Sequence, residues 1–243
     1  MNDFLTPSWP APANVHALVT TRAGGVSSGV YASLNLGDHV GDEPTAVAEN
    51  RAILRRATGC YPLWLKQVHG TAVAINGEAR QVADGAVSRM PGFACAMMTA
   101  DCLPVLLCDR AGTVVGAAHA GWRGLCDGVI EATVRAMGVP GAELLAWLGP
   151  AIGPTAFEVG GEVREAFLAR NLAAEAAFVA RDKNKWLCDI YLLARQRLVE
   201  AGVTDISGGD LCTVSDADRF YSYRRDGVTG RMASLVWLEG REK

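Results

Sequence analysis

Apolar residues recur along the chain at two spacings, and each spacing predicts one type of element. Short apolar runs predict strands over 15–21, 63–68, 71–75, 93–98, 103–107, 113–118, 144–148 and 232–238. Apolar positions three or four residues apart predict helices over 43–59, 122–137, 162–170 and 190–201. Gly59 and Gly138 end two of these helices, and Asp189 precedes the last, as capping residues do.

The predicted strands and helices interleave irregularly. Strands cluster over 63–75 and 93–118 without intervening helices, whereas a regular βαβ array alternates strand and helix. No internal repeat, low-complexity segment or long linker is evident. We therefore expect one domain, residues 1–243, of α/β class in the α+β sense, with mixed sheets and helices outside them.

Composition and charge narrow the class of protein. Half of the residues are hydrophobic and 20% are charged, which is ordinary for a globular chain. The 23 Lys and Arg against 26 Asp and Glu give a net charge of −3, so we expect no nucleic-acid partner. The N-terminus has no signal-peptide pattern and no apolar run is long enough for a membrane span, so we expect no membrane association.

The cysteine pattern favours a reducing compartment. The seven cysteines are odd in number and form no CxxC pair. We expect a cytoplasmic protein with reduced thiols rather than a disulfide framework. Five cysteines are expected to be small core residues: Cys60, Cys95, Cys108, Cys126 and Cys188.

Three residues at the ends of predicted elements suggest a reactive centre: His69, Cys102 and His119. The spacings of 33 and 17 residues are too long for a zinc finger. Three ligands on separate strands, with a fourth position left for water, are typical of catalytic zinc. The same residues also suit a cysteine nucleophile with a histidine base, so both interpretations stay open. His16 and His39 are expected to be structural or solvated.

Arginines beside glycine-rich segments suggest an anion site. The predicted helix start at 120–124 offers free backbone N–H groups and carries Arg123. Arg22 begins a glycine-rich loop, and Arg225 lies in a segment dense in aromatic residues and arginines, 220–231. The loop at 22–29 lacks the lysine and hydroxyl residue of a P-loop.

Eight motifs in order make the chain similar to the YfiH/laccase-domain family, whose members are described as multicopper polyphenol oxidases or purine nucleoside phosphorylases. The resemblance extends from about residue 15 to 238. The motifs occupy residues 21–27, 33–37, 67–70, 99–104, 119–124, 148–153, 212–213 and 222–225.

The resemblance implies an α/β/β/α layered domain, similar to cytotoxic-necrotizing-factor deamidases. It also implies zinc at His69, Cys102 and His119, with Cu²⁺ possible by substitution, and these three as the catalytic residues. The implied reactions are phosphorolysis of adenosine, inosine and 5′-methylthioadenosine, and adenosine deamination. Nucleoside and phosphate are then the partners of a monomer, and four residues are the candidates to bind them: Arg22, Asn35, Arg123 and Arg225.

Three other functions compete with this one. Bacterial relatives suggest a cysteine or zinc hydrolase that edits cell-wall precursors carrying a wrong amino acid. A copper oxidase is disfavoured because a trinuclear cluster needs many more than the chain's four histidines. A non-catalytic binding module is disfavoured because Cys, His and Arg concentrate at element ends.

Overall fold

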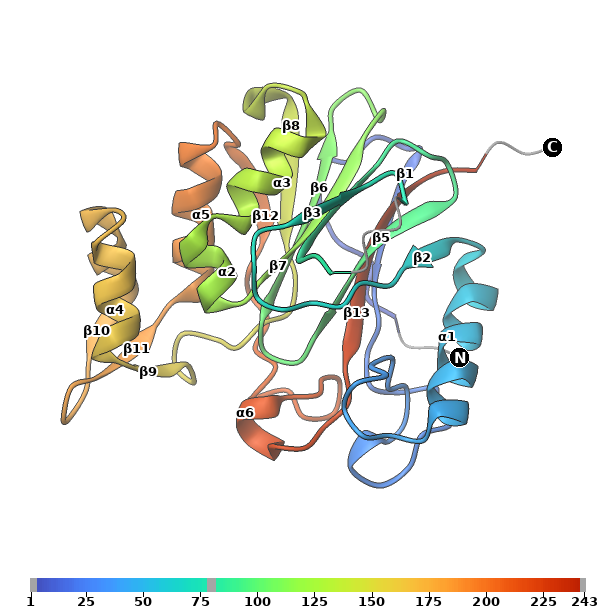
Figure 1. Ribbon diagram of the computed structural model, residues 1–243, viewed down its shortest axis with the longest axis horizontal. Coiled ribbons are helices and arrows are strands. Elements are labelled where there is room, and N and C mark those ends of the chain that lie inside the picture. Colours follow the sequence, from blue (N-terminus) through green and yellow to red (C-terminus); the bar gives the residue numbers. More distant parts are fainter. Residues whose placement is uncertain (1–3, 78–81, 241–243) are drawn as a thin grey trace.

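Two β-sheets packed face to face form the centre of the protein (Figure 1). The computed structural model describes residues 4–77 and 82–240. The six-stranded sheet has the order β12 (Asp205–Gly208), β8 (Leu144–Leu148), β6 (Leu103–Asp109), β7 (Val115–Ala120), β4 (Gly85–Ser88) and β3 (Val73–Ile75). The four-stranded sheet has the order β1 (Val15–Val19), β13 (Met232–Leu238), β5 (Phe93–Thr99) and β2 (Tyr61–Leu63). Both sheets mix parallel and antiparallel pairs, as expected.

Helices cover the outer faces of both sheets. On the four-stranded sheet lies α1 (Pro44–Thr58). On the six-stranded sheet lie α2 (Trp122–Asp127), α3 (Val129–Met137) and α5 (Ile190–Glu200). The order of layers is therefore helix, sheet, sheet, helix, and the mixed α/β class is confirmed. Short helical segments occupy Gly29–Tyr31, Gly141–Glu143 and, as α6, Tyr223–Asp226.

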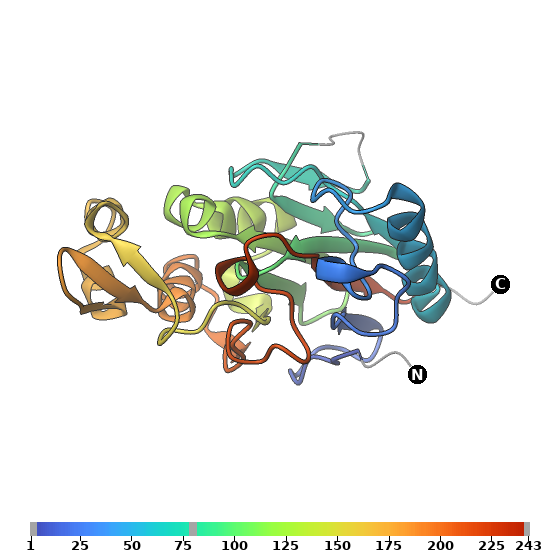
Figure 2. The ribbon, with the colours of Figure 1, turned by 90° about the horizontal axis from the view of Figure 1, so that it is seen from below.

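A small lobe projects beside α5 (Figures 1 and 2). It contains a three-stranded antiparallel sheet and α4. Its elements are β9 (Glu158–Gly160), α4 (Gly161–Leu168), a 3₁₀ helix (Leu172–Ala177), β10 (Phe178–Ala180) and β11 (Lys185–Cys188).

The central strands are buried on both faces. In β6, Leu103 and Val105 face the helices, while Leu106 and Cys108 face the other sheet. A strand covered on both sides needs apolar residues at every position. This is why continuous apolar runs predicted β5, β6, β8 and β13 correctly.

Two predicted elements differ from the structure. The helix expected over 122–137 is two helices, because Gly128 adopts φ 104° and ends the first. The strand expected over 63–68 is wrong for most of its length, since β2 ends at Leu63. Trp64 and Leu65 still pack into different cores, so their apolar character reflects burial without strand pairing.

The three expected helix caps are present. Gly59 and Gly138 cap α1 and α3 in the left-handed conformation. The Asp189 side chain accepts from the backbone N–H of Leu192 at the start of α5. All seven cysteines lie in the described residues and are free. Within residues 4–77 and 82–240, each helix is too short or too polar to cross a bilayer.

Candidate metal centre

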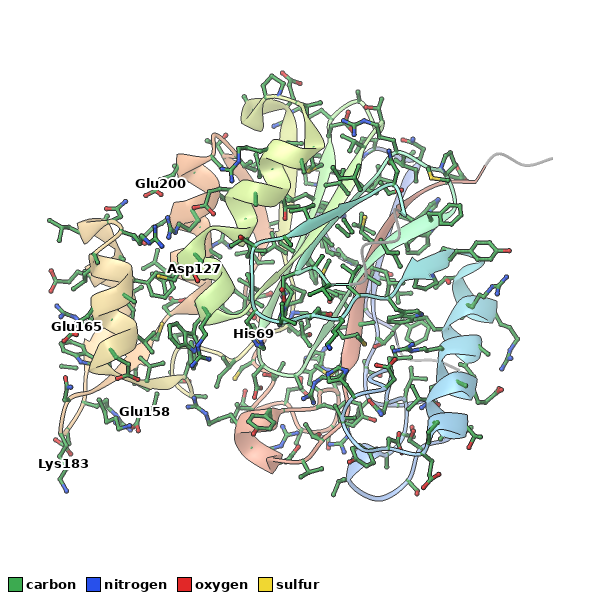
Figure 3. All side chains as sticks on the ribbon, in the orientation of Figure 1. His69, Asp127, Glu158, Glu165, Lys183 and Glu200 are labelled. Carbon is green, nitrogen blue, oxygen red and sulfur yellow. The ribbon has the colours of Figure 1, made fainter. Side chains whose placement is uncertain are left out.

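The structure brings His69, Cys102 and His119 together. Antiparallel pairing of β6 with β7 aligns Pro104 with His119, so the turn carrying Cys102 meets the end of β7. The Cys102 Sγ lies 3.6 Å from the Nε2 of His69, and the three ligand atoms lie within 4.8 Å of one another. Figure 3 shows His69 just below α2.

The distance between the Cys102 and His69 ligand atoms fits a tetrahedral metal site. Zn–S and Zn–N bonds of about 2.3 and 2.0–2.1 Å place a thiolate and an imidazole nitrogen ~3.5 Å apart. The distance of 3.6 Å between Cys102 and His69 matches that value. One thiolate and two imidazoles also leave a fourth position free. The donor set therefore fits zinc.

Asp84 holds two of the three residues in place. Its buried carboxylate accepts the backbone N–H groups of Val68, His69 and Gly70. These bonds fix the left-handed backbone of His69, at φ 61°. The carboxylate also accepts from Nδ1 of His119 at 2.8 Å, which leaves Nε2 of His119 free to bind a metal.

Asp84 was not predicted from the sequence. It lies directly before a four-residue strand, where no periodicity is visible. A carboxylate between Ala83 and Gly85 at the edge of an apolar segment was the only available signal.

Asp101 fixes the turn that carries Cys102. Its φ is 93°, a left-handed conformation that is rare outside glycine. One carboxylate oxygen accepts from the Thr213 hydroxyl at 2.5 Å, and the other from the backbone N–H of Arg224 at 2.6 Å. The turn is thus tied to two distant loops.

The charges of the site favour a thiolate. Burial alone would raise the pKa of Cys102, but the His119 and His69 imidazoles lower it to about 6. Burial would lower the pKa of His119, but Cys102 and the hydrogen-bonded Asp84 raise it to about 9. A thiolate is the form that binds a metal or acts as a nucleophile.

Gly121 is required by the close packing around the centre. A Cβ there would lie 2.6 Å from Cδ2 of His69 and 3.0 Å from Sγ of Cys102. We expect Gly121→Ala to lower metal content several-fold with little loss of thermal stability, because its φ of −63° suits alanine. Metal analysis with a thermal melt measures both. Gly240→Ala, whose Cβ would meet nothing within 4 Å, is the control; equal metal content in the two variants would contradict the expectation.

A pocket of about 400 Å³ opens over the centre. This volume lies in the range of small-molecule sites, ~300–1,000 Å³. Apolar side chains come from α2, the 149–157 segment and α5: Trp122, Ile152, Phe157 and Ile190. Polar side chains include His39, Gln67, Tyr223, Arg224 and Arg231. The exposed His39, expected to be structural or solvated, therefore borders the pocket.

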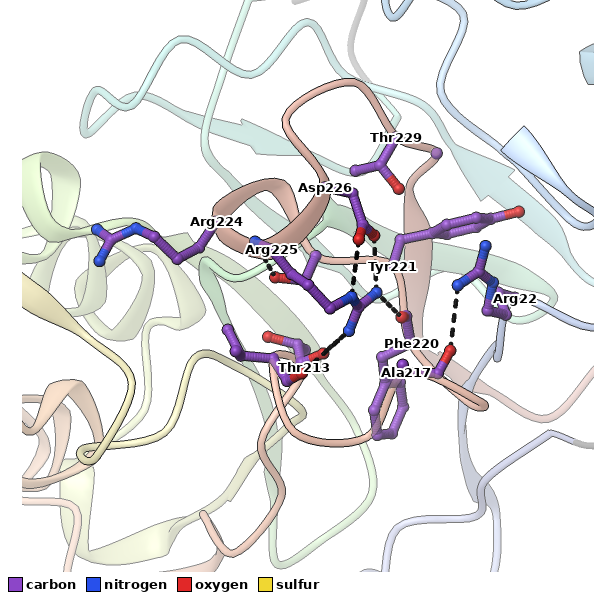
Figure 4. Close-up of polar contacts among 12 residues, drawn as sticks. Arg22, Thr213, Ala217, Phe220, Tyr221, Arg224, Arg225, Asp226 and Thr229 are labelled. Carbon is purple, nitrogen blue, oxygen red and sulfur yellow. Dashed lines mark hydrogen bonds and ion pairs between the residues drawn. The ribbon is translucent and has the colours of Figure 1, made fainter. Parts of the chain in front are cut away.

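The four residues proposed to bind nucleoside or phosphate are absent from the described lining of this pocket. Arg22 donates to the carbonyls of Ala32 and Ala217 and borders a separate shallow depression. Arg225 donates to backbone carbonyls, including that of Thr213, and pairs with Asp226 (Figure 4). All three guanidinium nitrogens of Arg225 and two of those of Arg22 therefore donate to acceptors within the chain.

Asn35 and Arg123 have different surroundings. Asn35 is fully buried and hydrogen-bonds Gly37, Asp42 and the backbone N–H of Arg231. Arg123 is exposed on α2, with its guanidinium 4.4 Å from the centre of the Trp122 ring.

Residues 16–239 match the family model described as multi-copper polyphenol oxidoreductase laccase. The chain belongs to this YfiH/laccase-domain family. A relative from Pseudomonas aeruginosa, named purine nucleoside phosphorylase, is 61% identical over 98% of this chain and all of its own. The Escherichia coli relative, named purine nucleoside phosphorylase YfiH, is 56% identical over the same shares.

Solved structures of the family have the same fold. A Neisseria meningitidis protein, 54% identical, superposes with a TM-score of 0.95 over 98% of this chain and all of that one. A Bacillus licheniformis protein titled hypothetical protein YfiH, 32% identical, gives a TM-score of 0.86 over 93% of each chain. The family resemblance and fold class expected from the sequence are confirmed.

Proposed function

We propose that this member of the YfiH/laccase-domain family is a zinc-dependent enzyme that cleaves purine nucleosides with phosphate. The observation that carries the proposal is the convergence of His69, Cys102 and His119 in a pocket lined by both apolar side chains and arginines. The names of its relatives support the substrate class. Adenosine, inosine and 5′-methylthioadenosine are the proposed nucleosides.

In this reaction a phosphate oxygen forms a bond to C1′ of the ribose while the bond from C1′ to the purine nitrogen breaks. The purine leaves with the electron pair and takes up a proton. The products are the free base and ribose 1-phosphate, or 5-methylthioribose 1-phosphate when the substrate is 5′-methylthioadenosine. A planar base fits against the Trp122 and Phe157 side of the pocket, where aromatic rings exclude water.

His69, Cys102 and His119 would hold the zinc, and the hydrogen bond of Asp84 to Nδ1 would leave Nε2 as the ligand atom of His119. When bound, zinc with an open position acts as a Lewis acid and lowers the pKa of water. That chemistry is also what hydrolytic deamination requires, so we propose adenosine deamination as a second activity of the same site. Seven free thiols support action in the cytoplasm, and we propose a monomer.

One observation favours a second candidate, a cysteine hydrolase acting on cell-wall precursors. The Cys102 thiol, with its pKa of about 6, lies 3.6 Å from Nε2 of His69, which is the arrangement of a nucleophile and its base. A copper oxidase is less suited, because two of the chain's four histidines already belong to the three-residue centre. Copper bound at the centre would be a substitution for zinc.

The test of the proposed function is incubation with adenosine and phosphate, with products separated by chromatography. We expect adenine and ribose 1-phosphate, loss of turnover after removal of metal by a chelator, and recovery on adding zinc. Inosine would show deamination. Unchanged turnover after complete metal removal would favour the cysteine mechanism, and no turnover with metal present would contradict a nucleoside substrate.

A further inference from the structure

Arg231 is a cation in the pocket that lacks a carboxylate partner within the described residues. It lies directly before β13 and lines the pocket with the three centre residues. Among the ion pairs of residues 4–77 and 82–240, none includes Arg231. Burial lowers its pKa although Cys102 and Asp101 act to raise it, so the guanidinium is only partly compensated.

The described residues accept hydrogen bonds from one nitrogen of this guanidinium and from neither of the other two. Nη1 donates to the carbonyls of Thr229 and Gly230 at 3.0 and 2.9 Å. The backbone N–H of Arg231 donates to Asn35, and its carbonyl accepts from Leu36. The hydrogen bonds of the described residues use neither Nε nor Nη2, which together form the edge that grips an oxyanion in a bidentate way.

Gly37 packs against the stem of the same side chain. A Cβ at Gly37 would lie 2.8 Å from Cγ of Arg231. Asn35 and Gly37 belong to the motif at residues 33–37. Their contacts indicate that this motif positions Arg231 and does not itself bind a ligand.

The other pocket arginine serves a different purpose. Arg224 is exposed, donates from Nη1 to the carbonyl of Glu158 in the small lobe, and gives its backbone N–H to Asp101. Figure 3 shows Glu158 at the base of the lobe. Arg224 therefore links the lobe to the turn that carries Cys102. Its Nε and Nη2 are also unused by the described residues, but its side chain is exposed, whereas Arg231 is half-buried and its stem packs against Gly37.

We propose that Arg231 binds the phosphate oxyanion in the pocket and that the segment containing Asn35 and Gly37 positions it. This inference rests on the proposed function, because phosphate is the co-substrate of phosphorolysis. The apolar groups of α2, the 149–157 segment and α5 then take the base. Arg231 binds the phosphate, whose oxygen forms the bond to C1′ as the purine leaves.

The first test measures KM for phosphate and for inosine, and direct binding of inorganic phosphate by calorimetry. We expect Arg231→Gln to raise KM for phosphate and weaken phosphate binding by about 10-fold or more, since charge-assisted bidentate bonds are lost. KM for inosine should stay within about two-fold, because the variant leaves the apolar side unchanged. Arg56→Gln, an equal charge change on exposed α1, is the control.

A second variant displaces the Arg231 side chain by a substitution at a neighbouring residue, Gly37. Gly37→Ala should raise KM for phosphate in the same direction, while Gly240→Ala should not. This variant keeps the proposal testable if Arg231→Gln fails to fold, which circular dichroism detects. Unchanged phosphate KM and binding in both folded variants would overturn the assignment.

The outcomes separate this proposal from the proposed function. Phosphate binding that depends on Arg231 in a protein without phosphorolysis would support the oxyanion site and refute the reaction. Normal phosphorolysis in Arg231→Gln, or an Arg123→Gln variant that alone loses phosphate binding, would refute the site and retain the reaction. A third arm uses adenosine 5′-monophosphate: Arg231-dependent binding of the ester without binding of free phosphate would support the oxyanion site with an ester as its source.

Discussion

Replacing Cys102 with alanine is expected to remove the bound metal and reduce nucleoside turnover by about 100- to 1,000-fold while the protein still folds. The thiolate is one of the three proposed ligands, and two histidines alone would hold zinc far less tightly. Loss of one major electrostatic contributor in an active site commonly costs about 10²–10³-fold in rate. Cys102 is only partly buried and lies in a turn, so its side chain contributes little to the core.

The measurement combines metal content, thermal stability and product formation from inosine and phosphate. Cys126→Ala is the matched control, because this buried cysteine lies on α2 outside the group of three ligands. The control should keep its metal and its turnover. Full phosphorolysis of inosine by Cys102→Ala would refute the assignment of the centre.

Replacing Asp84 with alanine is expected to lower both metal affinity and the free energy of unfolding. Without the carboxylate, three backbone N–H groups and Nδ1 of His119 lose their acceptor. A buried donor without a partner costs about 1–3 kcal/mol, so we expect a loss of at least about 3 kcal/mol in total. Metal affinity should fall by about 10–100-fold, because the carboxylate orients a ligand.

The control variant Asp109→Ala distinguishes the loss of metal affinity in Asp84→Ala from its loss of unfolding free energy. Asp109 is also a buried carboxylate, and it accepts from the backbone N–H groups of Thr113 and Val114, away from the centre. Urea unfolding of the metal-free proteins should show comparable losses for both variants. Only Asp84→Ala should also weaken zinc binding; equal zinc affinity in the two variants would show that Asp84 stabilises the fold alone.

The sequence predicted that His69, Cys102 and His119 form one centre because each lies where an apolar run begins or ends. His69, Cys102 and His119 were visible as chemically distinctive residues at such points. Asp84 was not visible, because its importance arises from packing of β4 beside β7 and from the folded-back turn at 68–70. Neither the strand pairing nor the position of this turn can be recognised from the residues next to Asp84 in the sequence.

Local sequence also could not show which arginine has guanidinium nitrogens without partners among the described residues. Arg225 attracted attention through its aromatic surroundings, yet its guanidinium satisfies carbonyls of its own loop and of Thr213 (Figure 4). Arg231 lies in the same segment, and only the approach of residues 35–37 from the N-terminal part of the chain shows how it is held. Two arginines of the same segment thus differ in which hydrogen-bond acceptors the fold places beside them.

The small lobe adjoins the pocket at its two ends. The chain enters the lobe just after Phe157 and leaves it just before Ile190, and both residues line the pocket. His69, Cys102 and His119 lie outside this excursion of about thirty residues. A substitution or insertion within the lobe can therefore alter the pocket through Phe157 and Ile190 without changing any residue of the three-residue centre.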